Sequence, residues 1–273
     1  MIQNLTNAFI SNNLHKTAVI HPNAKLGKDV EVGPYSVIGP NVTIGDGTKI
    51  DAHTVIKGWT KIGKNCLIYS HAVIGSEPQD RKFLGEKSYV ILGDGTQVRE
   101  FVTINRATGE NLETKIGSDC LLLAYSHVAH NCTVGNHVTM SNAATLAGHV
   151  TVEDKVTIGG LAGIHQFVRV GRNAMIGGLS KVVQDVPPFI TVDGNPAYAA
   201  GLNTVGLIRA GMNETTRRIL KRAYKILYLS GWKLSQAVAI MEQQLPLCSE
   251  LEDLIRFLQN TERGICRVAN HKN

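Results

Sequence analysis

A six-residue period runs through the first two thirds of the chain and constrains the fold more than any other feature. Counted in steps of six from Ile20 to position 188, the chain has 29 such positions, and 25 of them are Ile, Leu, Val or Met. The 43% hydrophobic background would give about 12 by chance. Glycine often follows the aliphatic residue, as at Gly33 and Gly45. A period of six fits neither an α-helix nor the simple alternation of a strand.

The period instead predicts short strands joined by tight turns, with one aliphatic side chain pointing inward on each side. Three such units make one triangular turn of about 18 residues, and successive turns stack about 4.8 Å apart. A small residue after the aliphatic one lets the chain bend where a larger side chain would clash. The sequence therefore predicts a mainly β fold, a parallel β-helix of about nine turns built from hexapeptide repeats.

Four positions break the period, and three of them indicate loops. Asp80 and Glu86 lie in a polar stretch near 76–91, and Glu110 lies near 106–115. Loops that leave a rigid scaffold commonly carry function. The fourth position is a proline in the segment DVPPF (185–189), where the coil should end. We therefore expect a catalytic β-helix domain over 1–192 with two loops.

Residues 193–273 are predicted to form a linker and a C-terminal α-helical domain. The expected helices cover 213–230, 234–244 and a stretch that starts at Ser249. Asn213 can cap the first helix, and Gly231 can end it. Ser249 and Glu252 fit a capping box. The open ends of a β-helix are exposed sheet edges, which the N-terminal residues and these helices can cover.

Composition excludes several classes of protein. With 43% hydrophobic and 18% charged residues in 273, the chain can bury a core and does not resemble a disordered tail protein. It has neither a run of 18 apolar residues nor a signal-peptide pattern, so we expect a cytoplasmic protein without stable membrane insertion. The five cysteines lack a CxxC spacing, which favours reduced thiols and no metal site.

The net charge of +6 lies almost entirely in the last quarter of the chain. Residues 201–273 hold 11 Lys and Arg against 6 Asp and Glu, which gives +5, and residues 1–200 hold 17 against 16. Several of these cations share the first predicted helix: Arg217, Arg218, Lys221, Arg222 and Lys225. The helix suits an anionic partner or a solvated face equally well. It lacks the interleaved aromatic residues of nucleic-acid binding, so no nucleic acid is expected.

The six-residue period sorts seven of the ten histidines into two groups, which share His149. Members of the first group occupy the fourth position of their unit, which predicts an exposed turn: His53, His71, His137 and His149. The second group is a cluster. His130, His149 and His165 lie 19 and 16 residues apart, so turns of 18 residues place them along one face, with His127 close to His130.

Two chemistries fit this cluster of imidazoles. One is activation of a hydroxyl or an amine by a general base, and the other is a zinc ion held by three histidines. No cysteine or carboxylate ligand pattern supports zinc. The phosphate-binding and metalloprotease motifs GxGxxG, GxxxxGK[ST] and HExxH are all missing from the sequence.

Six segments of the chain stand out: GSEPQDRKFLGE (75–86), TINRATG (103–109), SHVAHNCTVGN (126–136), NAATLAGHV (142–150), GIHQFVRVG (163–171) and QDVPPF (184–189). With these segments in this order, the chain resembles the UDP-N-acetylglucosamine acyltransferases that begin lipid A synthesis. The resemblance implies a left-handed parallel β-helix with a C-terminal α-helical domain. It also implies a homotrimer with active sites between neighbouring coils.

The implied reaction moves a 3-hydroxyacyl chain from acyl carrier protein to the glucosamine 3-position of UDP-N-acetylglucosamine. No cofactor is implied, because the carrier-protein thioester is the donor. By the same resemblance His130 is the general base, and the Gly148 backbone N–H stabilises the oxyanion. Asn131 stands where many relatives have an aspartate that orients the catalytic imidazole. Substrate-binding roles are implied for Gln79, Asp80, Lys82, His127, His149, His165, Gln166, Asn203 and Arg209.

Three further features follow from the resemblance. Gly178 matches the floor of the acyl channel and predicts a long chain, which its neighbour Leu179 can shorten. Val205 replaces a glutamate of the relatives and removes one hydrogen bond to the sugar. A carrier-protein docking role is implied for the basic helix, through Arg217, Arg218, Lys221 and Arg222.

Three alternatives remain at the level of the sequence. The first keeps the chemistry and changes the acceptor to a 3-amino UDP-sugar. The second is a zinc enzyme like the γ-class carbonic anhydrases, which needs neither the helical domain nor the loop around Gln79. The third is a β-helix that binds or scaffolds without catalysis, which leaves the histidine cluster without a role.

Overall fold

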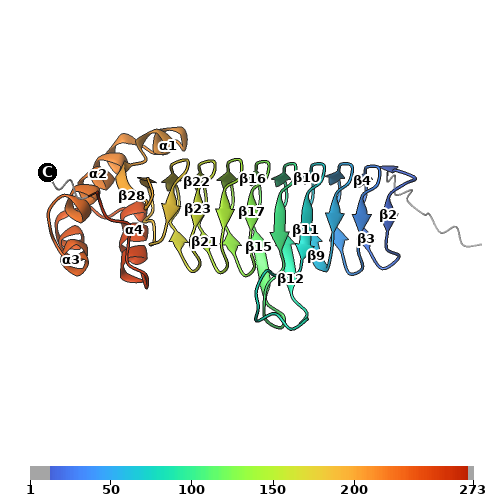
Figure 1. Cartoon of the computed structure of the whole chain (residues 1–273). Helices are drawn as coiled ribbons and strands as arrows, with labels where there is room; N and C mark the ends of the chain where they lie inside the picture. The colour runs from blue at the N-terminus through green and yellow to red at the C-terminus, as the bar shows by residue number, and fades with distance from the viewer. Residues whose placement is uncertain (1–12, 270–273) are drawn as a thin grey trace, which may run out of the picture.

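The computed structural model describes residues 13–269, which form a three-sided coil with helices at its C-terminal end (Figure 1). Within the coil, over 13–182, consecutive strands belong to different sides, and each pairs in parallel with a strand three positions before or after it. Val37 pairs with Val55 and Ile38 with Ile56, which is the predicted offset of 18 residues. The predicted parallel β-helix is confirmed.

Three sheets, which we call A, B and C, run along the coil. Sheet A contains β1 (Asn13–Leu14), β4 (Glu31–Val32), β7 (Lys49–Ile50), β10 (Leu67–Ile68), β13 (Gln97–Val98), β16 (Leu121–Leu122), β19 (Thr139–Met140), β22 (Thr157–Ile158), β25 (Met175–Ile176), β27 (Ile190–Asp193) and β28 (Tyr198–Leu202). Sheet B contains β2 (Val19–Ile20), β5 (Val37–Ile38), β8 (Val55–Ile56), β11 (Val73–Ser76), β14 (Thr103–Asn105), β17 (His127–Val128), β20 (Thr145–Leu146), β23 (Gly163–Ile164) and β26 (Lys181–Val182). Sheet C contains β3 (Lys25–Leu26), β6 (Thr43–Ile44), β9 (Trp59–Ile62), β12 (Tyr89–Leu92), β15 (Glu113–Ile116), β18 (Thr133–Val134), β21 (Thr151–Val152) and β24 (Arg169–Val170).

The aliphatic residue of each unit builds the core of the coil. In sheet B, four consecutive turns bury Ile38, Ile56, Ile74 and Ile104. Burying each such side chain stabilises the fold by about 1.5–3 kcal/mol. Several small polar residues in the fifth position of the unit, among them Ser36, Thr48 and Thr54, are buried too, and they donate to a carbonyl of the next turn. One of them is Cys132, whose thiol donates to the Ala147 carbonyl and whose pKa burial raises to about 12.

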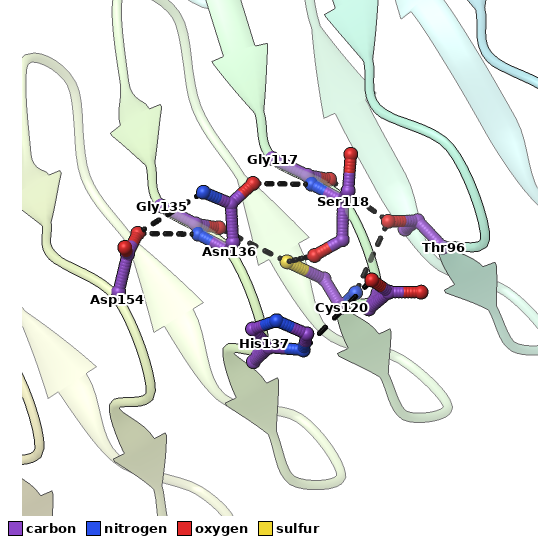
Figure 2. Close-up of polar contacts among 9 residues, drawn as sticks. Thr96, Gly117, Ser118, Cys120, Gly135, Asn136, His137 and Asp154 are labelled. Atoms are coloured by element: carbon purple, nitrogen blue, oxygen red, sulfur yellow. Dashed lines mark hydrogen bonds and ion pairs between the residues drawn. The ribbon is translucent and has the colours of Figure 1, made fainter.

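The corners of the coil explain the glycines and the exposed histidines. Residues in the fourth position adopt the left-handed conformation, and the four predicted turn histidines have φ between 56° and 64°. At the corner between sheets C and A, Asp154 Oδ1 accepts from the Asn136 N–H at 2.7 Å, and Asn136 Oδ1 accepts from the Ser118 N–H at 2.9 Å (Figure 2). A Cβ on Gly135 would collide with this carboxylate, so glycine leaves room for the side chain that caps the turn.

Two loops leave the coil side by side at the corner between sheets B and C, which we call the BC corner (Figure 1). They cover 77–88 and 106–112. Both are shorter than the predicted stretches 76–91 and 106–115, because β12 pairs with β9 and β15 pairs with β12 in sheet C. The exposed outer residues of β15, Glu113 and Lys115, make that strand look polar in the sequence.

The stretch that follows the coil is a hairpin and not the expected linker. β27 pairs with β25 of the coil, and β28 pairs antiparallel with β27. Ala197 and Ala199 are buried. The pairing extends sheet A and fixes the helical domain to the end of the coil.

Four helices follow: α1 (Thr204–Arg209), α2 (Glu214–Tyr228), α3 (Leu234–Gln244) and α4 (Ser249–Gln259). The predicted cap of α2 is present, since Asn213 Oδ1 accepts from the Thr216 N–H at 2.8 Å. The predicted capping box of α4 is wrong. Cys248 is the N-cap, and the Ser249 hydroxyl contacts the Glu250 carboxylate instead. None of the described helices is long and apolar enough to cross a membrane.

The helical domain packs around a core of its own, which includes Phe189 from the exit of the coil. Phe189 is fully buried and joins Leu207, Leu220 and Leu251. The N-terminal residues that we expected to cover the opposite end of the coil, 1–12, lie outside the described residues, as do 270–273.

Candidate active site

The histidine cluster lies on the BC corner, beside the two loops. The His130 and His149 rings are perpendicular, with centroids 5.2 Å apart, and Phe167 stacks on His149 at 4.7 Å. Asn131, His149 and Phe167 occupy the fourth position in three consecutive turns, so the 18-residue repeat aligns them. The coil therefore presents a column of rings beside His130.

The amide of Asn131 fixes the hydrogen-bonding role of His130. Asn131 Oδ1 accepts from the Thr108 N–H at 3.0 Å, and Asn131 Nδ2 donates to the Thr108 carbonyl at 3.0 Å. These two backbone partners allow only one orientation of the amide. Asn131 Oδ1 lies 2.8 Å from His130 Nδ1, so Nδ1 carries the proton. The neutral imidazole then has its free lone pair on Nε2.

Asn131 faces Nδ1 of the His130 ring, and Gly148 packs against the Cε1 and Nε2 atoms. A Cβ at this position would stand 2.6 Å from both Cε1 and Nε2 of the imidazole. Within residues 13–269 the Gly148 N–H has no hydrogen-bond partner, whereas its carbonyl accepts from the Phe167 N–H at 3.2 Å. The corner therefore places Gly148, whose N–H is free among the described residues, next to the ring that carries the proton-accepting nitrogen.

His127 is the first residue of β17, the strand that leads into the BC corner. Its Nδ1 contacts the Thr103 hydroxyl at 2.7 Å, one turn away in the same sheet. Burial lowers the pKa of His127, contact with Thr103 opposes the shift, and the nearby His130 adds to it. His127 is therefore held neutral at physiological pH and offers hydrogen bonding without charge.

The first loop brings charged side chains over the histidines. The Lys82 N–H donates to Asp80 Oδ1 at 3.0 Å, and this bond, with the charge of Lys82, holds the pKa of Asp80 below its usual range. Burial lowers the pKa of His149, as do His130 and Lys82, while Asp80 acts in the opposite direction. The loop residues and the two histidines thus share one electrostatic environment.

Arg106 holds the first loop in place from the base of the second. Its guanidinium donates to the Glu86 carbonyl at 3.1 Å and lies over the rings of Trp59 and Phe83 at 5.3 and 4.8 Å. It also approaches Glu77 at 3.5 Å. The two loops are therefore a packed unit that keeps Asp80 and Lys82 over the corner.

The structure places the other predicted residues as follows. Gln79 is exposed on the first loop, and His165 and Gln166 are exposed on the BC corner two turns after His130, with His165 Nδ1 3.1 Å from the Gln166 carbonyl. Asn203 caps α1 and donates to the Asn173 carbonyl at the corner between sheets C and A. Arg209 is exposed at the end of α1.

Two further predicted features are not brought to His130 within one chain. Gly178 lies at the corner between sheets A and B, which we call the AB corner, at the opposite edge of sheet B from His130 and three turns further along. On α2, Arg218, Lys221 and Arg222 are exposed, while Arg217 is half-buried. Arg218 also pairs with Glu214 at 2.6 Å.

Sequence reasoning missed Phe167, Thr103 and Thr108 as neighbours of the histidines. Phe167 was accessible from the sequence, because it follows His149 by one 18-residue turn in the same position. The two threonines were not, because the loops interrupt the count between turns. Thr103 and Thr108 contact His127 and Asn131 across 24 and 23 residues.

The arrangement suits acid–base chemistry better than metal binding. No group of three or more His, Cys, Asp or Glu in residues 13–269 is placed to hold a metal ion. Nδ1 of His130 faces an amide, Nδ1 of His127 faces a hydroxyl, and the rings do not converge on one point. An unprotonated imidazole nitrogen beside a free N–H can instead take a proton from a nucleophile and stabilise an oxyanion.

Three family models match the chain. Residues 185–266 match the second domain of UDP N-acetylglucosamine O-acyltransferases, residues 113–148 match the bacterial transferase hexapeptide (six repeats), and residues 14–109 match a GMPPB C-terminal domain.

Several curated relatives named acyl-[acyl-carrier-protein]--UDP-N-acetylglucosamine O-acyltransferase align over almost their whole length. The protein of Halorhodospira halophila is 45% identical over 93% of this chain and 99% of its own. That of Thermodesulfovibrio yellowstonii is 49% identical over 94% of this chain and 100% of its own.

Solved structures agree with these sequence matches. LpxA from Acinetobacter baumannii superposes with a TM-score of 0.90 at 42% identity, over 93% of this chain and 99% of that one. The acyltransferase of Francisella novicida also gives 0.90, at 34% identity, over 94% and 95%. This likeness supports the left hand of the coil.

Proposed function

The chain belongs to the UDP-N-acetylglucosamine O-acyltransferase family of lipid A synthesis, which acylates UDP-N-acetylglucosamine from acyl carrier protein, and we propose that His130 is its general base. The observation that carries this proposal is the hydrogen bond of 2.8 Å between His130 Nδ1 and Asn131 Oδ1. Because the Thr108 backbone fixes the amide, the imidazole keeps Nε2 free to accept a proton.

In the proposed reaction, His130 Nε2 takes the proton of the sugar 3-hydroxyl as its oxygen attacks the thioester carbonyl of a 3-hydroxyacyl carrier protein. The Gly148 N–H donates to the oxyanion that forms. The C–S bond then breaks, and the imidazolium returns the proton to the departing thiol. The thioester supplies the activated acyl group, so the reaction needs no cofactor.

Substrate-binding roles are proposed for the residues that share the family motifs. The loop residues Gln79, Asp80 and Lys82 would meet the sugar and the acyl chain, and the charges of Asp80 and Lys82 already act on the histidines. His127, His149, His165 and Gln166 line the same side of the coil. Asn203 and Arg209 would meet the glucosamine and the phosphate.

A homotrimer is proposed because residues with implied roles lie on different corners of one chain. Its further support is an exposed ladder on the AB corner, made by Tyr35, His53, His71, Phe101, Tyr125, Leu161 and Leu179. Five of these rings stack at 4.8–5.2 Å, and Tyr125 and Leu161 are 62% and 63% exposed. An exposed row of aromatic and aliphatic side chains of this kind marks an interaction surface.

The trimer proposal has a direct test. A ladder that packs against the next copy would bring the AB corner with Gly178 toward a neighbouring BC corner. Tyr125→Glu combined with Leu161→Glu should then shift the mass in sedimentation equilibrium from three chains toward one. A variant that keeps the wild-type mass would remove the ladder from the interface.

The catalytic proposal is tested by a transfer assay with purified protein. UDP-N-acetylglucosamine and its 3-amino analogue are offered side by side with 3-hydroxyacyl carrier proteins of several lengths. His130→Ala should lose transfer by about 10²- to 10⁴-fold. The control is His137→Ala, an exposed turn histidine at the corner between sheets C and A. Turnover by His130→Ala at the level of this control would exclude the general-base role, and transfer to the amino sugar alone would change the acceptor.

A further inference from the structure

A single peptide group, Thr108–Gly109, contacts both Glu86 and Asn131. Its N–H, from Gly109, donates to Glu86 Oε1 at 2.7 Å. Its carbonyl, from Thr108, accepts from Asn131 Nδ2 at 3.0 Å. Asn131 Oδ1 in turn faces His130 Nδ1 at 2.8 Å. An unbroken chain of hydrogen bonds therefore links a carboxylate on the first loop to the imidazole on the coil.

The links of this chain polarise one another in the same direction. A negative charge on the N–H side of a peptide increases the negative charge on its carbonyl oxygen, which becomes a better acceptor. The Asn131 amide receives this effect at Nδ2 and transmits it to Oδ1. The oxygen that faces His130 thereby carries more negative charge than an isolated amide would.

Glu86 has several contacts that favour its charged form. Its second oxygen, Oε2, accepts from the Leu84 N–H at 2.7 Å. The Gly109 N–H, its own N–H, the Leu84 N–H and the charge of Arg106 hold the pKa of Glu86 below its usual range. Glu86 is thus a carboxylate at physiological pH.

We propose that Glu86 is a positioning residue, which acts on His130 through the Thr108–Gly109 peptide and the Asn131 amide. It holds the amide in the orientation that keeps Nε2 of His130 unprotonated, and it supplies negative charge to the imidazolium formed during transfer. An aspartate beside the histidine would supply that charge directly, whereas this chain delivers it through two amides. The inference rests on the proposed role of His130 as the base.

Glu86→Gln separates this role from simple loop packing. Glutamine keeps one oxygen that can accept from the Gly109 N–H, and the contact of Arg106 with the Glu86 backbone carbonyl still joins the loops, while the charge and the contact with the Leu84 N–H are lost. The matched control is Glu110→Gln, because Glu110 also joins the two loops, accepting from the Lys87 N–H at 3.1 Å, but has no contact with the relay. Both variants lose one carboxylate from the same pair of loops.

We expect Glu86→Gln to lower kcat about tenfold with little change in either KM, on the scale seen for partners that orient metal-bound histidines. The acid limb of the kcat profile should move to lower pH, since the imidazolium loses a favourable charge. The other charged or titratable groups around His130, namely Asp80, Lys82, His127 and His149, stay unchanged. Glu110→Gln should keep the wild-type kcat and profile, and Glu86→Asp should keep the position of the limb.

A second readout needs no turnover. Nitrogen-15 NMR of histidine-labelled protein reports which ring nitrogen of His130 carries the proton. We expect the Nδ1–H form in all three proteins, because the Thr108 backbone still fixes the Asn131 amide, and ring protonation at a lower pH in Glu86→Gln alone. Identical spectra and identical pH profiles for the two variants would overturn the relay. Failure of His130 as the base would appear separately, as turnover by His130→Ala.

Discussion

Gly148 and His130 pack so closely that a Cβ on Gly148 would stand 2.6 Å from the imidazole Nε2. The contact arises because Gly148 follows β20 one turn after His130 follows β17, so the two residues sit directly above each other on the BC corner. Any side chain at position 148 must displace the ring that we propose as the general base.

Gly148→Ala is therefore expected to lower kcat by about 10²-fold, the scale of an ångström-sized misplacement in a catalytic site. The backbone N–H stays in place, so the loss would arise from the displaced imidazole. Transfer is measured at saturating substrate. The Tm should change little, because the ring can move toward solvent. A variant with normal kcat would show that the ring position seen here is not the working one.

The depressed pKa of His127 predicts how stability depends on pH. Burial lowers the pKa of this imidazole in the folded chain, so the unfolded chain binds its proton at a higher pH. Stability is then full above the unfolded value of about 6.5 and is lost as the pH falls below it. The Tm of the wild type should drop between about pH 7.5 and 5.5, and His127→Gln should reduce that drop.

The control for this prediction is His137→Gln, which removes an exposed histidine from another corner. It should show the same drop in Tm as the wild type. Equal drops in all three proteins would mean that His127 is not the group whose protonation destabilises the fold.

Charge reversal on α2 tests the proposed docking of the carrier protein. Lys221 and Arg222 are exposed and have no ion-pair partner among the described residues, whereas Arg218 already pairs with Glu214. Lys221→Glu with Arg222→Glu should raise the KM for acyl carrier protein several-fold, and the effect should shrink at high salt.

Lys25→Glu provides the control for charge, since Lys25 is exposed near the opposite end of the coil. Its KM for the carrier protein should equal that of the wild type. The same KM and salt dependence in all three proteins would argue against docking on α2.

The coil could be predicted from the sequence because its backbone repeats. The position of a residue within the six-residue unit then gives its position on the coil. Inward residues such as Ile56 and turn residues such as His149 follow directly from the six-residue count. The same count places His149 and Phe167 in one column. Wherever the repeat is regular, the sequence predicts neighbours as well as strands.

The contacts that complete the site could not be predicted, because they come from the parts of the chain that leave the repeat. The Thr108 backbone reaches Asn131 only through the path of the second loop, and Glu86 reaches Gly109 only because the loops pack together. The hairpin at 190–202 was hidden for a related reason. Its Gly and Pro residues suggested a linker, whereas pairing with β25 makes it part of sheet A.

The AB corner offers the sharpest test of the proposed acyl-chain ruler. Gly178 is exposed, and a Cβ there would meet only the Gly160 backbone, at 3.3 Å from the carbonyl oxygen. A longer side chain would therefore extend outward, along the surface beside Leu179. We expect Gly178→Met to move the preferred donor to a shorter acyl chain, because the added atoms would occupy the end of the channel.

Ala52→Met is the matched control for this prediction. Ala52 occupies the same position of its unit on the AB corner, three turns before β17, whereas Gly178 lies three turns after it. Both variants add a methionine three turns away from His130 along the coil. Only Gly178→Met adds it in the direction of the helical domain. kcat/KM is measured for 3-hydroxyacyl carrier proteins of increasing length. A shortened preference in Gly178→Met alone would place the end of the acyl chain at that side of the coil, and an unchanged preference in both variants would exclude Gly178 as the ruler.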